Sequence, residues 1–242
     1  MTDPASGALQ RRCRENLAAI RGRVAEACRR AGRPDGSVTL IGVTKYVGVE
    51  TTRLLLEAGC RDLAESRPQQ LWEKAAAIGD AEPHPVWHLI GNLQRNKVRR
   101  TLPVVSLVHT LDSPRLLAAI EAEAAALGRP CEVLIEVNLT TDPGRSGVVE
   151  AEVPSLVAAA ATAVHVRLRG LMGMASHPDS AAADARREFA RLRELRDRLA
   201  AAGFADQLRE LSMGMSGDLE EAILEGSTMV RIGSALVEGC GG

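Results

Sequence analysis

The sequence has very few aromatic side chains. Two tryptophans, two phenylalanines and one tyrosine make up 2% of the 242 residues. The core therefore has to be filled by leucine, valine, isoleucine and alanine, and hydrophobic residues of all kinds reach 45% of the chain. This composition excludes an intrinsically disordered chain and is typical of closely packed helices and strands of the α/β class.

Cysteine provides no framework for disulfides. The five cysteines are scattered along the chain, no C-x-x-C pair occurs, and their number is odd. A chain of this length with such a pattern is expected to keep its thiols reduced, as in the cytoplasm. The first residues also lack the apolar stretch of a signal peptide, which again predicts a cytoplasmic protein.

An excess of one charge and long apolar runs are lacking as well. The chain carries 30 basic and 31 acidic side chains, so no global attraction to nucleic acid or to an anionic membrane is expected. No run approaches the ~20 apolar residues of a membrane-spanning helix. We therefore predict no nucleic-acid or membrane partners, and any ligand has to be recognised locally. The protein is expected to be a monomer.

What the chain does contain is a regular alternation of β-rich and helical segments. Apolar residues spaced three and four apart from Leu9 to Cys28 predict an amphipathic N-terminal helix. Helical patterns such as those at 113–128 and 180–203 separate short β-rich runs. Eight such runs occur, at residues 38–44, 62–66, 86–91, 106–112, 131–139, 167–176, 209–215 and 229–237.

This alternation decides the expected fold. Strands that alternate with helices pair in parallel through crossovers, and eight such units in about 250 residues match a closed (β/α)8 barrel. An open, doubly wound sheet is the alternative. We expect one domain over residues 1–242, with the N-terminal helix (residues 1–33) packing on the barrel.

Lys45 ends the first predicted strand, in the stretch "VTLIGVTKYVGVE". In a barrel the carboxyl ends of the strands surround the active site. One interpretation is a surface lysine whose amine reaches into water. The other is a partly desolvated amine that captures a carbonyl as a Schiff base.

Glycine and serine gather at the ends of the last two predicted strands. Gly233 and Ser234 follow the eighth, where barrels often hold a phosphate on backbone N–H groups. Ser212 and Ser216 flank the Met-Gly-Met at the end of the seventh, and Ser216 is also a candidate cap for the next helix. The pattern indicates an anion site, although glycine and serine also serve ordinary turns.

Arg231 lies inside the apolar run "MVRIG", where a guanidinium needs a partner. A core carboxylate such as Glu136 is one candidate, and a ligand's ring nitrogen or phosphate is the other. Together with Lys45 and the phosphate cradle, this arginine describes a site for a phosphorylated aldehyde. Pyridoxal 5′-phosphate (PLP) is the obvious candidate.

The chain resembles the pyridoxal phosphate homeostasis protein family, also described as YggS-like or proline synthase co-transcribed proteins. The resemblance covers nearly the whole chain, and its longest matching segment is highly specific. Its segments are "GVTK", "WHLIGNLQRNK", "VLIEVNL", "RGLMGMASH" and "LSMGMSGDLEEAILEGSTMVRIGSALVEG".

This resemblance implies the barrel fold of the alanine racemase N-terminal domain. It further implies that Lys45 carries PLP covalently as an internal aldimine, and that Arg231 faces the pyridine nitrogen. Ser212, Gly233 and Ser234 would hold the phosphate.

The chain departs from the family at one position near the cofactor. Where much of the family has an asparagine after the second strand, this chain has Ser66 in "LAESRPQQ". A serine can still donate a hydrogen bond, with a shorter reach. Ser66 therefore stays a candidate cofactor-binding residue.

Three functions fit such a site. An arginine at the pyridine nitrogen keeps that nitrogen largely unprotonated and makes the ring a poor electron sink. Alanine racemase takes its second base from an additional domain, and the single tyrosine here, Tyr46, points away from Lys45 if the strand continues through both. We therefore favour a PLP carrier in vitamin B6 and amino-acid homeostasis, with PLP-dependent apo-enzymes as possible recipients. An amino-acid racemase is the alternative, and a Schiff-base aldolase is a weaker third.

The remaining candidates are weaker. His84 and His88 are four apart, but flanking prolines and the strand at 86–91 prevent the helical face of a metal pair. The basic cluster at 94–100 contains no aromatic residue for base stacking and is interpreted as a solvated face. His177 and Asp179 follow the sixth strand and could approach the ligand.

Overall fold

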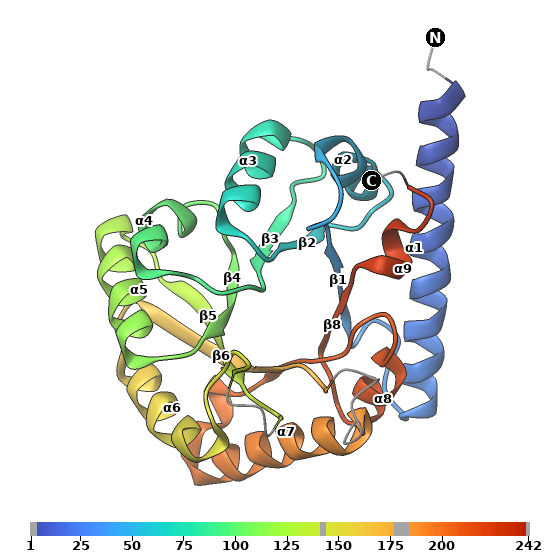
Figure 1. The fold of residues 1–242 in the computed structure, drawn as a ribbon. Coiled ribbons are helices and arrows are strands. Elements are labelled where there is room, and N and C mark those ends of the chain that lie inside the picture. Colours follow the sequence, from blue (N-terminus) through green and yellow to red (C-terminus); the bar gives the residue numbers. More distant parts are fainter. Residues whose placement is uncertain (1–3, 141–143, 177–183, 241–242) are drawn as a thin grey trace.

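The chain folds into a closed barrel of eight parallel strands. A computed structural model describes residues 4–140, 144–176 and 184–240. The strands follow one another around the barrel in chain order, and the eighth pairs with the first (Figure 1). This closure confirms the predicted barrel and excludes the open sheet. The strands are β1 (Thr39–Val43), β2 (Asp62–Glu65), β3 (Val86–Leu89), β4 (Leu107–Leu111), β5 (Cys131–Val137), β6 (Val166–Gly173), β7 (Glu210–Ser212) and β8 (Met229–Ile232).

Helices connect the strands on the outside of the barrel (Figure 1). Local signals set their limits, as α5 illustrates: Ser113 accepts a hydrogen bond from the Leu116 N–H, Pro114 is the first residue, and Gly128 ends the helix at a φ of 70°. The α-helices are α1 (Pro4–Arg30), α2 (Val49–Glu57), α3 (Pro68–Ile78), α4 (Val98–Thr101), α5 (Pro114–Leu127), α6 (Val153–Thr162), α7 (Ala185–Leu199), α8 (Leu219–Leu224) and α9 (Ser234–Val237). The shorter helical turns are η1 (Arg95–Lys97), η2 (Glu150–Glu152), η3 (Ala200–Phe204) and η4 (Ala205–Gln207).

The predicted N-terminal helix is α1, which runs along the outside of the barrel beside α8 and α9 (Figure 1). Its apolar stripe is buried, as the spacing of three and four requires. Cys13 of α1 lies 3.4 Å from Cys240, sulfur to sulfur, and both thiols are buried. The last described residue therefore packs against this helix.

The eighth strand is shorter than the sequence suggests. The apolar run 229–237 predicts one strand, but β8 ends at Ile232 and residues 234–237 form α9. Gly233 turns the chain out of the sheet, with φ of −112° and ψ of −81°. A short apolar run does not distinguish a buried strand from a buried helical turn, because both faces of each are covered.

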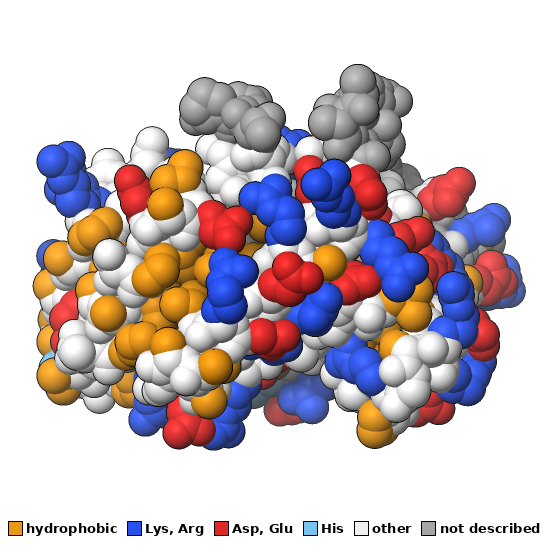
Figure 2. Space-filling view, turned by 90° about the horizontal axis from the view of Figure 1, so that it is seen from below, with side chains coloured by type: hydrophobic (Ala, Val, Ile, Leu, Met, Phe, Trp, Pro, Cys, Tyr) orange, Lys and Arg blue, Asp and Glu red, His pale blue; other side chains and the backbone are white. Residues whose placement is uncertain are grey.

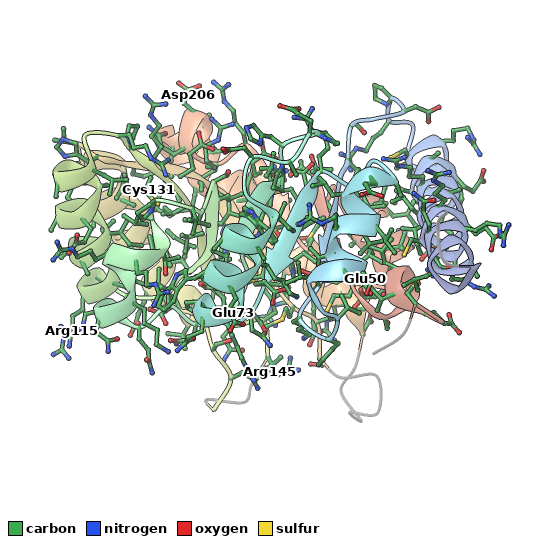
Figure 3. The ribbon with its side chains drawn as sticks, turned by 90° about the horizontal axis from the view of Figure 1, so that it is seen from above. Glu50, Glu73, Arg115, Cys131, Arg145 and Asp206 are labelled. Atoms are coloured by element: carbon green, nitrogen blue, oxygen red, sulfur yellow. The ribbon has the colours of Figure 1, made fainter. Side chains whose placement is uncertain are left out.

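The parallel strands give the barrel two distinct ends, one where every strand starts and one where every strand finishes. In Figure 3 the strands start at the upper edge, marked by Cys131 and Asp206, and finish at the lower edge, marked by Glu50 and Arg145. The space-filling view in Figure 2 shows basic and acidic side chains interspersed on the right of the view and hydrophobic side chains gathered on the left. Arg191 and Arg198 both pair with Glu150. No helix within the described ranges is long and apolar enough to cross a membrane.

Candidate functional site

Lys45 lies just beyond the end of β1. Ile41 and Val43 pack inside the barrel, and Lys45 follows them at the carboxyl end of β1, where the barrel has its mouth. A turn closed by the Val47 N–H and the Thr44 carbonyl (3.0 Å) holds this position. The half-buried Lys45 side chain makes no hydrogen bond or ion pair with any described residue. Its amine is therefore available to a ligand.

The position of Tyr46 differs from the expectation. The prediction that Lys45 and Tyr46 face opposite sides required the strand to continue through both, but β1 ends at Val43. The turn brings the Lys45 amine to 4.8 Å from the centre of the Tyr46 ring. Tyr46 itself is 73% exposed.

A buried ion pair fastens the turn that carries Lys45. The Lys74 amine of α3 donates to the Glu65 carboxylate at 2.5 Å and to the Thr44 carbonyl at 2.7 Å. The Thr44 hydroxyl donates to the same Glu65 oxygen at 2.6 Å. These groups lie between the barrel wall and α3, on the outer side of the strands, and they hold the residue directly before Lys45.

Arg231 is buried inside the barrel and bonded to neutral oxygens. Its Nη1 donates to the Ser212 carbonyl (2.7 Å) and hydroxyl (2.6 Å), and its Nη2 donates to the Gly173 carbonyl (3.0 Å). Burial lowers the pKa of Arg231 to about 10, against the raising effect of the Glu136 and Asp218 carboxylates, so the guanidinium is charged at neutral pH. A guanidinium has five N–H donors, and these bonds use three of them, so two N–H groups of Arg231 are left for a ligand.

Glu136 is not the ion-pair partner that the sequence allowed for Arg231. No ion pair joins the two side chains, both of which lie in the described part of the chain. The Glu136 carboxylate accepts a hydrogen bond from the Ser146 hydroxyl (2.6 Å), and burial raises the pKa of this carboxyl. The charge of Arg231 therefore lacks a directly bonded carboxylate, which suits a site that receives an electron-rich group.

The serines at the ends of β7 and β8 divide between two places. Ser212 lies inside the barrel with Arg231, whereas the Ser216 hydroxyl accepts a hydrogen bond from the Ala235 N–H (3.4 Å). Gly233 and Ser234 begin α9 beside Ser216. The sequence pattern offered both Ser212 and Ser216 for an anion site, and the family resemblance implied Ser212 with Gly233 and Ser234. In the structure, Ser216 is the serine that lies beside Gly233 and Ser234.

Ser216 does not cap α8, contrary to the expectation. Asp218 is the residue before that helix, and its carboxylate accepts from the Met215 N–H (2.6 Å). The hydroxyl of Ser216 instead lies at the start of α9, so the loop after β7 is joined to the loop after β8.

Ser66 follows β2 at the same end of the barrel as Lys45 and is half-buried. The chain after β3 passes very close to it, because a Cβ added to Gly91 would lie 2.0 Å from the Ser66 carbonyl oxygen. Only glycine allows this approach. The close contact fixes Ser66 in the mouth without assigning its hydroxyl a protein partner.

A cavity opens at the same end of the barrel. It has a volume of about 630 Å³ and is lined by Arg145, Ser176, Asp184, Met215 and Asp218, among others. Arg145, which is labelled in Figure 3, donates to the Ala175 carbonyl (3.0 Å). The ends of β6 and β7 therefore border a space large enough for a small ligand.

Two histidines inside the barrel escaped the sequence analysis. His88 and His109 face each other from β3 and β4, with 2.9 Å between His88 Nδ1 and His109 Nε2. The usable signal was a polar residue at an inward position of each apolar strand, "VWHL" and "LVHTL". The spacing of His84 and His88 does not indicate this pair, because His109 lies on the next strand. Within the described ranges, no group of three residues could hold a metal ion.

The remaining candidates from the sequence are the basic cluster at 94–100 and the pair His177 and Asp179. Arg100 of the 94–100 cluster stacks on the Trp72 ring, 4.3 Å from its centre. His177 and Asp179 lie outside the described residues.

Comparisons with known proteins place the fold in a known family. The chain matches the family described as alanine racemase, N-terminal domain, over residues 16–239. An alanine racemase of Clostridium difficile, 17% identical, has the same fold with a TM-score of 0.72 over 93% of this chain and 56% of that one. Fold and site thus define a barrel of the alanine racemase N-terminal type.

More similar relatives narrow this class. The pyridoxal phosphate homeostasis protein of Aquifex aeolicus is 36% identical over 92% of this chain and 96% of its own. The structure of PipY from Synechococcus elongatus with PLP bound is 32% identical over 93% of this chain and 99% of that one, with a TM-score of 0.78. The chain belongs to the family of pyridoxal phosphate homeostasis proteins.

Proposed function

We propose that this protein binds PLP in the mouth of its barrel and acts in intracellular PLP and amino-acid homeostasis. The observation that carries the proposal is the Lys45 amine. The chain has only three lysines, and Lys74 is held in a buried ion pair while Lys97 lies in η1, outside the strands. The PLP-bound state of PipY supports the choice of ligand.

The residues present fit the group. PLP supplies an aldehyde that can bond to an amine, a ring nitrogen that can accept a hydrogen bond, and a phosphate. We assign the covalent link to Lys45 and the ring nitrogen to one of the two spare N–H donors of Arg231. The N–H groups at Gly233 and Ser234 and the Ser216 hydroxyl are our candidates for the phosphate.

Two sequence-based candidates take modified roles in this proposal. The Ser212 hydroxyl accepts a hydrogen bond from Arg231 Nη1, so Ser212 acts by holding Arg231 rather than by binding the phosphate. Ser66 stays a cofactor-binding candidate beside Lys45.

A carrier fits this arrangement better than a transaminase or a β-eliminating enzyme, whose chemistry relies on a protonated ring nitrogen. The guanidinium of Arg231 is charged, and a second positive charge on an adjacent ring nitrogen would be repelled. Chemistry that depends on a protonated ring is thereby disfavoured. We further propose that the protein acts as a monomer in the cytoplasm and supplies PLP to apo-enzymes.

Arg231→Gln should weaken PLP retention by about tenfold or more, because a charged hydrogen-bond donor is replaced by a neutral one. Equilibrium dialysis of PLP against wild type and variant measures this. Circular dichroism checks that the variant is folded. Equal retention in a folded variant would assign Arg231 a purely structural role.

The racemase alternative predicts exchange of the amino-acid Cα hydrogen. We expect no deuterium incorporation above background when the PLP-loaded protein is incubated in heavy water with a panel of amino acids. The matched control is Tyr46→Phe, which removes the only tyrosine hydroxyl. Rapid exchange by wild type that this variant loses would establish Tyr46 as a second base and overturn the carrier proposal.

A further inference from the structure

A line of hydrogen bonds runs through the barrel from the start of β2 to Arg231. Asp62 Oδ1 lies 3.2 Å from His88 Nε2, His88 Nδ1 lies 2.9 Å from His109 Nε2, and His109 Nδ1 lies 2.9 Å from the Ser212 hydroxyl. The Ser212 hydroxyl accepts from Arg231 at 2.6 Å. Because β4 and β7 are not neighbours, the bond from His109 to Ser212 crosses the interior of the barrel.

The two ends of this line are chemically opposite. Arg231 can only donate hydrogen bonds, and an ionised Asp62 can only accept them. Asp62 is at the solvent-accessible end of the line. Its side chain is 31% exposed and lines a cavity of about 440 Å³ between α1 and the starts of β1 and β2. The intervening groups are almost fully enclosed, with His88 at 3% and His109 and Ser212 at 0% exposure.

These ends determine where each proton sits. Ser212 accepts from Arg231 and donates its own hydrogen to His109 Nδ1. His109 then carries its proton on Nε2 and donates it to His88 Nδ1. His88 likewise carries its proton on Nε2 and donates it to Asp62, so every bond in the line is satisfied.

The opposite arrangement of the histidine protons leaves the contact with the Asp62 carboxylate without a hydrogen. If both histidines carried the proton on Nδ1, His88 Nε2 would be a bare acceptor facing the Asp62 oxygen, with no hydrogen between them. The Ser212 hydrogen would also lose its acceptor. Burial, with the nearby His88 and Arg231, lowers the pKa of His109 well below its ordinary value, so this ring is neutral and carries a single proton.

We propose that Asp62, His88 and His109 are positioning residues that act in one direction through Ser212 to hold Arg231 in place. The carboxylate at the opposite end of the barrel is thereby coupled to the group that receives the ring nitrogen. The effect on PLP rests on the proposed function, whereas the direction of the line does not.

Nitrogen-15 NMR of the ligand-free protein tests the direction. Long-range proton–nitrogen spectra distinguish the two histidine tautomers, and the chain has only five histidines to assign. We expect both His88 and His109 to be protonated on Nε2 at neutral pH. A proton on Nδ1 of either neutral ring, or a charged His109, would overturn the proposal.

Asp62→Asn tests the coupling, because an amide can donate as well as accept. We expect a second tautomer of His109 to appear and the affinity for PLP to fall by about fivefold. The control is Asp206→Asn, an exposed carboxylate at the same end of the barrel that pairs only with Arg209 among the described residues. Unchanged His109 signals in Asp62→Asn would refute the coupling.

The two proposals fail differently. If the wild-type protein shows the expected tautomers but does not bind PLP, the directed line of hydrogen bonds is supported and the proposed function is refuted. If it binds PLP but the tautomers are reversed or insensitive to Asp62→Asn, the directed line is refuted and the proposed function is supported.

Discussion

Lys45→Ala is expected to abolish covalent attachment of PLP. Lys45 has the only amine in the described barrel mouth that is free of ion pairs and hydrogen bonds, and alanine offers no nucleophile. The yellow colour of the loaded wild type should vanish in the variant. After borohydride reduction, mass spectrometry of the wild type should show one PLP adduct on the peptide that contains residue 45, and the variant should show none.

The small number of lysines provides a matched control. Lys97→Ala removes the other lysine outside the Lys74–Glu65 ion pair, and it should leave both the colour and the adduct unchanged. If the adduct persisted in Lys45→Ala at Lys97 or Lys74, the Lys45 assignment would be wrong. If the wild type formed no adduct at all, covalent attachment itself would be refuted.

The barrel could be predicted because the sequence pattern that specifies each strand is local and is repeated eight times. Each strand is a short apolar run between turn residues, and eight repeats leave little choice of topology. Element ends were harder, as at β8, where "MVRIGSALV" is uniformly apolar although the chain changes from strand to helix at Gly233. The backbone angles of one residue decide that boundary, and composition does not encode them.

The site was predicted unevenly for a similar reason. Lys45 and Arg231 stood out because a cation in an apolar strand needs an explanation. Ser212 and Ser216 have different neighbours because β7 ends at Ser212, which bonds Arg231, whereas Ser216 lies in the following loop and bonds the Ala235 N–H. The contact between His109 and Ser212 joins residues 103 positions apart, so no local pattern could indicate it.

The Lys74–Glu65 pair illustrates how the fold supports the turn that carries Lys45. Glu65 is completely buried and Lys74 is 7% exposed, yet neither lies inside the barrel mouth. One carboxylate oxygen of Glu65 bonds Lys74 and Thr44, while the other, Oε2, has no hydrogen-bond partner. The neutralising charge of Lys74 is therefore what makes the buried carboxylate tolerable.

Lys74→Met should destabilise the protein by about 3–5 kcal/mol, because it leaves the Glu65 carboxylate buried without its cation. Urea denaturation followed by circular dichroism measures the loss. The variant Glu65→Leu/Lys74→Met replaces both charges by apolar groups and should recover most of the stability, since a buried pair is often no better than a packed apolar one. A loss in the single variant that the double variant does not recover would show that the packing of the lysine stem, rather than the charge, stabilises the Thr44–Lys45 turn. If the charge dominates, the double variant should also retain the adduct on Lys45.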